Sequence, residues 1–212
     1  MTDGPLTHLR VLELGTLIAG PFCGQLFGDM GADVIKIEPP GVGDPMRSWG
    51  RGLPVWWPVI ARNKRCITLN LRVAAGQDLL KRLLQESDVL IENFRPGTME
   101  KWGLDYEVLS AINPGLVMVR VSGFGQSGPY SSRAGYGSIG EAMGGIRYLA
   151  GDPDRPPSRV GLSIGDSLAA TFACVGALAA LHERDRTGQG QVVDSAIYEL
   201  SLIHISEPTS PS

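Results

Sequence analysis

The sequence has few cysteines and no excess of charge of one sign. Its 212 residues include three cysteines, and 19 Lys and Arg stand against 22 Asp and Glu, giving a formal net charge of -3. Cys23, Cys66 and Cys174 are far apart and lack CxxC spacing, which argues against a disulfide framework and a structural zinc site. The charge balance lacks the basic footprint of nucleic-acid-binding proteins. We therefore expect a reduced chain with no metal site and no nucleic-acid partner.

Long unbroken apolar runs are also missing. Met1 leads into polar residues rather than an apolar signal segment, and no stretch approaches the roughly 18 apolar residues that span a membrane. We expect a cytoplasmic protein with no membrane partner. Glycine and proline are plentiful instead, at 28 and 15 residues, and they separate the apolar segments. We expect the loops that they form to contain the functional residues.

Apolar runs alternate with segments of helical spacing through the first half of the chain. Strands are predicted at 9–14, 33–38, 66–71, 88–92 and 116–121. Helices are predicted at 21–30, 77–86 and 106–112, with Pro21 at the first position of its helix. This alternation predicts an α/β fold with a doubly wound, Rossmann-like parallel sheet. Ligands of such folds bind at the carboxyl ends of the strands.

The second half predicts fewer elements. Residues 137–149 and the alanine-rich segment 167–183 have helical patterns, and 191–197 is either a strand or a helix start. Residues 201–212, SLIHISEPTSPS, change abruptly to a Ser/Pro/Thr composition, as in a foreign read-through segment or a disordered native terminus. We expect residues 1–200 to belong to a larger domain and residues 201–212 to form a tail outside it.

Two features suggest a dinucleotide site. A GxGxxG motif at Gly123, Gly125 and Gly128 follows a predicted strand, but Pro129 and the residues after it extend the loop where the motif should open a helix. Glu38 ends a predicted strand at the place of a ribose-binding acid, although the preceding turn lacks the middle glycine of the motif. An NAD(P)-binding or non-catalytic α/β domain is therefore one alternative.

Two segments have residue types suited to phosphate or adenine. Arg62, Lys64, Arg65 and Arg72 lie within eleven residues and can hold a phosphate-rich ligand, or they form a solvated face. The turn at residues 92–97 offers an amide, an aromatic ring and a guanidinium. That set suits an adenine ring with a nearby phosphate, although an ordinary Pro-Gly turn over a buried Phe explains it equally.

Gly165 and Asp166 precede the alanine-rich helix. Asp166 is placed as its N-cap, and capping alone is one explanation of the residue. A helix N-terminus favours negative charge and keeps a carboxylate ionised, while Gly165 leaves space for a substrate. An ionised, accessible carboxylate can attack an activated acyl group as a covalent nucleophile.

Six stretches in this order resemble the class III CoA-transferase family, also called the CaiB/BaiF family. The similar stretches are VLELGTLIAGPFCGQLFGDMGADVIKIEPPGVGDPMR, RNKRCITLNL, DVLIENFRPGTMEKWGLDYE, VSGFGQSGPY, GLSIGDSLAA and ALHERDRTGQGQVVDSAIYE. They cover almost all of residues 8–199. The resemblance implies an incomplete large domain of an enzyme that forms a homodimer when full length, and a chain that is inactive by itself.

The resemblance also implies a reaction. Coenzyme A passes from an acyl-CoA thioester to a small carboxylic acid through an aspartyl-CoA intermediate on Asp166, so the CoA thioester is a substrate and no cofactor is permanently bound. The positions that match CoA contacts in the family are Leu69, Arg72, Asn93, Phe94 and Lys101. The positions that match the vicinity of the substrate are Ile18, Ser122 and Tyr136.

Three departures from the family pattern limit these implications. Pro39 stands where several relatives have an arginine that contacts the nucleotide, and Ile18 stands where the formyl-CoA enzyme has glutamine. Gly135-Tyr136-Gly137 replaces the Gly-Tyr-Asp of transferases and the Gly-His-Asp of racemases. Racemisation needs an acid and a base to exchange the α-proton, and without a histidine at position 136 this pair is broken. An acyl-CoA racemase or isomerase of the same family is therefore a less favoured alternative.

Overall fold

One six-stranded sheet forms the centre of the molecule in the computed structural model, which describes residues 4–50 and 52–200. Neighbouring strands are parallel throughout, in the order β3-β2-β1-β4-β5-β6. The strands are β1 (Arg10–Glu13), β2 (Asp33–Glu38), β3 (Lys64–Thr68), β4 (Val89–Glu92), β5 (Val117–Ser122) and β6 (Val192–Ala196). The strand order reverses between β1 and β4, which confirms the predicted doubly wound, Rossmann-like sheet.

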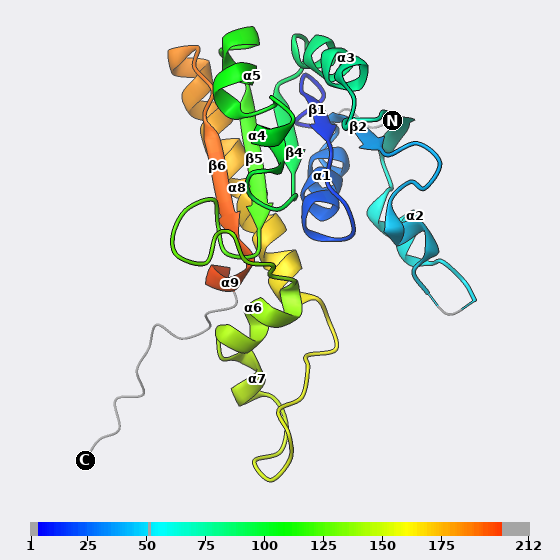
Figure 1. The fold of residues 1–212 in the computed structure, drawn as a ribbon, viewed down its shortest axis with the longest axis vertical. Coiled ribbons are helices and arrows are strands. Elements are labelled where there is room, and N and C mark those ends of the chain that lie inside the picture. The colour runs from blue at the N-terminus through cyan, green and yellow to red at the C-terminus, as the bar shows by residue number, and fades with distance from the viewer. Residues whose placement is uncertain (1–3, 51, 201–212) are drawn as a thin grey trace.

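Helices cover both faces of the sheet and its carboxyl edge (Figure 1). They are α1 (Ala19–Asp29), α2 (Trp56–Ile60), α3 (Ala74–Leu84), α4 (Thr98–Lys101), α5 (Tyr106–Ile112), α6 (Gly137–Met143), α7 (Ile146–Leu149), α8 (Ile164–Thr187) and α9 (Ile197–Leu200), with a 3-10 helix η1 (Pro45–Ser48). Figure 1 shows α6 and α7 beyond the carboxyl ends of β5 and β6. That is the edge at which ligands of this fold class bind.

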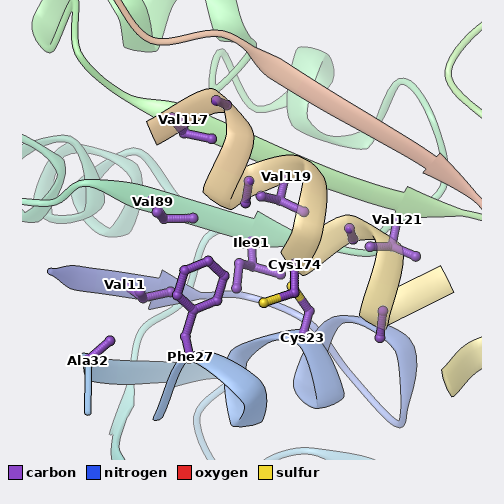
Figure 2. Close-up of a cluster of buried hydrophobic side chains, with 14 of the residues drawn as sticks. Val11, Cys23, Phe27, Ala32, Val89, Ile91, Val117, Val119, Val121 and Cys174 are labelled. Carbon is purple, nitrogen blue, oxygen red and sulfur yellow. The ribbon is translucent and has the colours of Figure 1, made fainter. Parts of the chain in front are cut away.

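Two buried cores separate the faces of the sheet. Alternate residues of each strand point to opposite faces, so Val117 and Val119 pack on the side of α1 and α8, whereas Met118 packs on the side of α3 and α5. Figure 2 shows the first core, in which Phe27 of α1 lies among the strand valines. The two cores fix the sheet between two helical layers.

Helix α8 packs on the sheet through alanine. Ala169, Ala173, Ala177 and Ala180 are buried at helical spacing, and α8 contacts α1, β5 and β6. Within the described residues, α8 is the one helix long and apolar enough to cross a membrane by length and composition. Its buried alanine face explains that composition, because small side chains let the helix approach the sheet closely.

The predicted strands agree with the observed ones within three residues, but two helical expectations were wrong in detail. Pro21 is the third residue of α1 rather than the first, a place that still suits proline because the first four N–H groups of a helix lack intrahelical partners. The predicted helix at residues 137–149 is divided into α6 and α7. Gly145, with φ of 85°, turns the chain between them.

Candidate active site

A cavity of about 660 Å³ lies at the carboxyl edge of the sheet, next to the point where the strand order reverses. Its walls are residues 16–19 after β1, residues 93–96 after β4 and residues 121–123 of β5 and the loop that follows. The remaining wall comes from Pro45, Trp49, residues 133–138, Arg159, Ser163, Asp166 and Ile197. This volume is in the range of small-molecule sites.

Asp166 is the carboxylate that the fold places in this cavity. It is the third residue of α8, and Ser163 is the N-cap, so the expectation that Asp166 itself caps the helix was wrong. The helix starts earlier than its apolar pattern suggested, and Asp166 faces α6. A Cβ at Gly137 would lie 2.5 Å from Asp166 Oδ2, so only glycine at position 137 leaves this carboxylate its space.

The surroundings of Asp166 oppose its negative charge. Burial and, to a smaller extent, the charge of Glu141 raise the pKa of Asp166, Arg159 acts in the opposite direction, and the net result is a pKa of about 6. The helix N-terminus was expected to keep the carboxylate ionised, but burial and a like charge are the larger influences here. Asp166 therefore becomes ionised above about pH 6, and in that form it is able to act as a nucleophile.

Glu141 is a site residue that the sequence did not reveal. It lies on α6 and is completely buried, and neither carboxylate oxygen has a hydrogen-bond partner in the described part of the chain. The Ser122 hydroxyl, on the cavity wall, is also buried and without a partner there. Unsatisfied buried polar groups are costly, so their concentration beside Asp166 indicates a functional site.

The structure brings together most of the residues that the sequence singled out. The predicted residues that line the cavity are Ile18, Asn93, Phe94, Ser122, Tyr136 and Asp166. The predicted residues that do not line it are Leu69, Arg72 and Lys101. Leu69 packs against the core below α3, and Lys101 is exposed at the end of α4. A CoA contact through these three residues stays a prediction.

Asn93 and Phe94 have structural partners of their own. Thr16 N donates to Asn93 Oδ1 at 2.8 Å, and Asn93 Nδ2 donates to Thr16 O at 2.9 Å. The Phe94 ring packs edge-on against Trp102, with centroids 5.3 Å apart. Asn93 therefore ties the turn after β4 to the turn after β1, and these two turns form adjoining walls of the cavity.

The cationic segment that suggested phosphate binding is largely used in ion pairs. The pairs are Arg62 with Asp29, Lys64 with Glu13 and Arg65 with Asp33. Arg72 forms no ion pair in the described residues and remains exposed. The structural alternative thus accounts for three of the four cations, although Lys64 is buried rather than solvated.

The dinucleotide alternatives find little support in the geometry. No helix opens after Gly128, because the next helix, α6, begins only at Gly137. Glu38 accepts from both Arg47 Nε and Arg47 Nη2 at 2.7 Å and from Asp44 N at 2.8 Å. Its oxygens are therefore engaged in holding the loop that follows β2.

The cysteines form no metal site. Cys23, Cys66 and Cys174 are free thiols, and Figure 2 shows Cys23 of α1 facing Cys174 of α8 inside the first core. Across residues 4–50 and 52–200, no group of three His, Cys, Asp or Glu side chains is arranged to hold a metal ion.

Comparison with known proteins identifies close relatives. The profile of CoA-transferase family III matches residues 6–210. Succinyl-CoA--D-citramalate CoA-transferase of Chloroflexus aurantiacus is 67% identical over 199 residues, which are 92% of this chain and 50% of that protein. The beta subunit of succinyl-CoA--L-malate CoA-transferase from the same organism is 47% identical over 216 residues, covering 100% of this chain and 53% of that protein.

A solved structure shares the fold. The crystal structure of a CaiB/BaiF family protein from Brucella suis superimposes with a TM-score of 0.90 and 42% sequence identity, covering 95% of this chain and 55% of that chain. The chain therefore spans about half the length of the relatives that it matches.

Proposed function

The chain belongs to CoA-transferase family III, and from this premise we propose that it transfers coenzyme A from an acyl-CoA thioester to a small carboxylic acid, with Asp166 as the covalent nucleophile. The observation that supports this proposal most strongly is the position of Asp166. Its carboxylate borders a cavity at the carboxyl edge of the sheet, and its pKa of about 6 leaves it ionised at neutral pH.

In the first half of the proposed reaction, an Asp166 oxygen attacks the thioester carbonyl carbon. The carbon–sulfur bond breaks, CoA leaves as the thiolate, and a mixed anhydride joins the acyl group to Asp166. The thiolate then attacks the aspartyl carbonyl carbon and releases the donor acid as its carboxylate. Asp166 is left as an aspartyl-CoA thioester, and acyl activation is conserved without ATP.

In the second half, the acceptor carboxylate attacks the aspartyl thioester and displaces the CoA thiolate. The thiolate attacks the acceptor acyl carbon of the new anhydride, which forms the product thioester and restores Asp166. Each attack places negative charge on a carbonyl oxygen. The Ser122 hydroxyl is the donor on the cavity wall that we propose to stabilise this charge, because it has no partner among the described residues.

We further propose that the acids exchanged are short dicarboxylic acids. The two relatives above are named for succinyl-CoA with citramalate or malate, and all three acids have a second carboxylate. Arg95, Arg133 and Arg159 line the cavity, and none of them forms an ion pair in the described residues. Guanidinium groups bind carboxylates through charge-assisted hydrogen bonds, which supports this substrate class.

The test is a transfer assay on the protein expressed from its complete open reading frame. Succinyl-CoA is incubated with individual dicarboxylic and monocarboxylic acids, and new CoA thioesters are identified by mass spectrometry. We expect a new thioester from at least one dicarboxylic acid, and none from Asp166→Asn. Asp78→Asn, an exposed residue of α3, is the matched control and should retain activity. Absence of transfer with every acid would refute the proposal.

A separate incubation distinguishes the racemase alternative. Tyr136 lines the cavity where a racemase has histidine, so the acid–base pair needed for α-proton exchange is incomplete. Incubation of a chiral 2-methylacyl-CoA in deuterated water should therefore give no deuterium at the α-carbon. Deuterium uptake without CoA transfer would favour the isomerase instead.

We include a homodimer without a permanently bound cofactor in the proposal. Large apolar side chains of α7 are exposed, with Tyr148 at 89% and Leu149 at 67%. Apolar surface of this kind is usually covered in an assembled protein. Light scattering on the purified protein should give the mass of a dimer, and its absorption spectrum should show no chromophore other than the aromatic residues.

A further inference from the structure

A second cavity adjoins the candidate active site. It has a volume of about 310 Å³ and shares four wall residues with the main cavity, namely Ile18, Trp49, Arg159 and Ser163. Residues that line both cavities lie at their junction. A ligand with one end at Asp166 therefore has a second space within reach, and Arg159 is the one charged group on the shared wall.

Arg159 differs from the arginines that stabilise the fold. Arg10, Arg120 and Arg184, for example, each form ion pairs with carboxylates of other segments. Arg159 forms no ion pair in the described part of the chain, and the residue is exposed in the loop before α8. It is nonetheless close enough to Asp166 for the two charges to interact. A cation in this position is available to an anionic ligand.

The other two cavity arginines are less suited to this role. The Arg133 guanidinium lies 4.3 Å from the centre of the Tyr130 ring, so its flat face is already stacked. Arg95 follows Asn93 and Phe94 in the turn after β4 and borders only the main cavity. Arg159 alone among these three lines both cavities.

We propose that Arg159 binds the free carboxylate of a short dicarboxylic acyl group while the thioester carbonyl of that group faces Asp166. This inference rests on the proposed function. The guanidinium forms a two-pronged, charge-assisted pair with the distal carboxylate, which fixes the far end of the acyl chain. A monocarboxylic acyl group of the same length offers only a methyl group to this cation. Arg159 thereby selects dicarboxylic over monocarboxylic substrates.

The experiment measures donor attachment alone, so that binding of the acceptor acid does not enter. The protein from the complete open reading frame is mixed with succinyl-CoA or butyryl-CoA, and covalent CoA attachment is followed by rapid quenching and intact-protein mass spectrometry. The variants are compared by the second-order rate constant of attachment, which is the observed rate constant divided by the donor concentration. Arg159→Gln removes the charge, Arg159→Lys keeps it, and Arg155→Gln in the same exposed loop, which lines neither cavity, is the matched control.

For Arg159→Gln we expect a loss of about 10- to 100-fold with succinyl-CoA and less than about threefold change with butyryl-CoA. Arg159→Lys should lie between Arg159→Gln and the unaltered protein, and Arg155→Gln should match the latter. Equal losses with both donors, or no loss with succinyl-CoA, would overturn the assignment. So would a selective loss in Arg133→Gln that is absent in Arg159→Gln. If the unaltered protein attaches CoA from neither donor, the proposed function itself fails.

Discussion

Two groups of buried charge in this protein are arranged in opposite ways. The first consists of Glu13 of β1, Lys36 of β2, Lys64 of β3 and Asp44 of the loop after β2. These are two anions and two cations, and their side chains are almost fully buried. The second lies between α6 and α8 and consists of Asp166 and Glu141, two carboxylates with no cation in contact among the described residues. The positive and negative charges of the first group balance each other, whereas both groups of the second are carboxylates.

In the balanced group, each charge has partners. Lys36 Nζ donates to Glu13 Oε1 at 2.8 Å and to Gly15 O at 2.7 Å, and Lys64 Nζ donates to Glu13 Oε2 at 2.7 Å. Burial would raise the pKa of Glu13, but the two lysines outweigh burial and lower it. Burial would likewise lower the pKa of Lys36, but Glu13 and Asp44 raise it.

The balanced group also positions the cavity wall. Asp44 Oδ1 accepts from Leu17 N at 3.1 Å, and Leu17 is a non-glycine residue with φ of 64°. Such a conformation costs of order 1 kcal/mol or more and persists only where the surroundings fix it. Lys36 and Asp44 therefore hold the turn after β1 in the shape that lines the cavity.

The two groups of buried charge differ in what they do to ionisation. The ion pairs of the first group rigidify the scaffold, lower the pKa of Glu13 and raise that of Lys36, although burial still lowers the pKa of Lys64. The pKa of Asp166, which has no such pair, is instead raised to about 6. Buried charges without partners and perturbed pKa values are concentrated at functional sites, although they are unfavourable for stability. We therefore expect substitutions in the first group to affect stability and substitutions in the second to affect reactivity.

The largest expected effect is on folding. Lys36→Met leaves Asp44 without its cation and Glu13 with one lysine, so we expect the free energy of unfolding to fall by about 3–5 kcal/mol. Urea unfolding measures this change. Arg65→Met breaks the exposed pair with Asp33 and should cost less than about 1 kcal/mol. Similar costs for the two variants would contradict the role of the buried group.

Next in size is the effect of crowding Asp166. In Gly137→Ala, the new Cβ would lie 2.5 Å from Asp166 Oδ2, so the carboxylate must move. A displaced nucleophile should reduce the rate of CoA attachment by about 100-fold, with little change in the melting temperature. Gly115→Ala is the control, because a Cβ there would meet its nearest atom, Arg184 Cδ, at an ordinary contact distance of 3.5 Å, and Gly115 lines neither cavity. An unchanged rate in Gly137→Ala would remove the geometric argument for Asp166.

A smaller effect concerns pH. In the proposed reaction Asp166 attacks as the carboxylate, so the rate of CoA attachment should rise with pH around a midpoint of about 6. Glu141→Gln removes a like charge and should lower this midpoint by about one pH unit. The pH–rate profile from pH 4.5 to 8 measures the shift, with the exposed Glu107→Gln of α5 as control. A midpoint that does not move would show that Glu141 does not act on Asp166.

The smallest expected effect is a gain in stability. The pKa of Asp166 is raised above its unfolded value of 3.8, so the native state loses stability as pH rises from about 4 through 6. Asp166→Asn has no carboxylate to ionise at this position and therefore does not lose this stability. It should be more stable than the unaltered protein by about 1 kcal/mol at pH 8. Urea unfolding at pH 4 and pH 8 tests the sign. A variant that is less stable at pH 8 would contradict a destabilised carboxylate.

The sheet was predictable because its signal is local. Runs such as VIKIE in β2 and VMVRVS in β5 are rich in β-branched residues, and the observed strands coincide with them closely. Short helices were missed because they contain too few residues to give a recognisable pattern. Helix α2 (Trp56–Ile60) is five residues long and contains proline, so its few residues give no periodic pattern.

The candidate site was predictable only in part. The motif around Asp166 predicted a carboxylate that the structure places at the cavity, but the partners of each charge come from distant segments. Lys64 appeared as a surface cation and is instead buried against Glu13, 51 residues away in sequence. Glu141 had one usable signal, a single charged side chain in an otherwise apolar stretch of α6. Its proximity to Asp166 depends on how α6 packs against α8.

The central claim is that Asp166 is the group to which acyl or CoA becomes attached. Hydroxylamine added during incubation with succinyl-CoA converts an activated aspartyl carbonyl to a hydroxamate, which peptide mass spectrometry locates. The account predicts a hydroxamate on Asp166 that requires succinyl-CoA and is absent from Asp166→Asn. CoA transfer that proceeds while the label is absent or lies on another residue would contradict it.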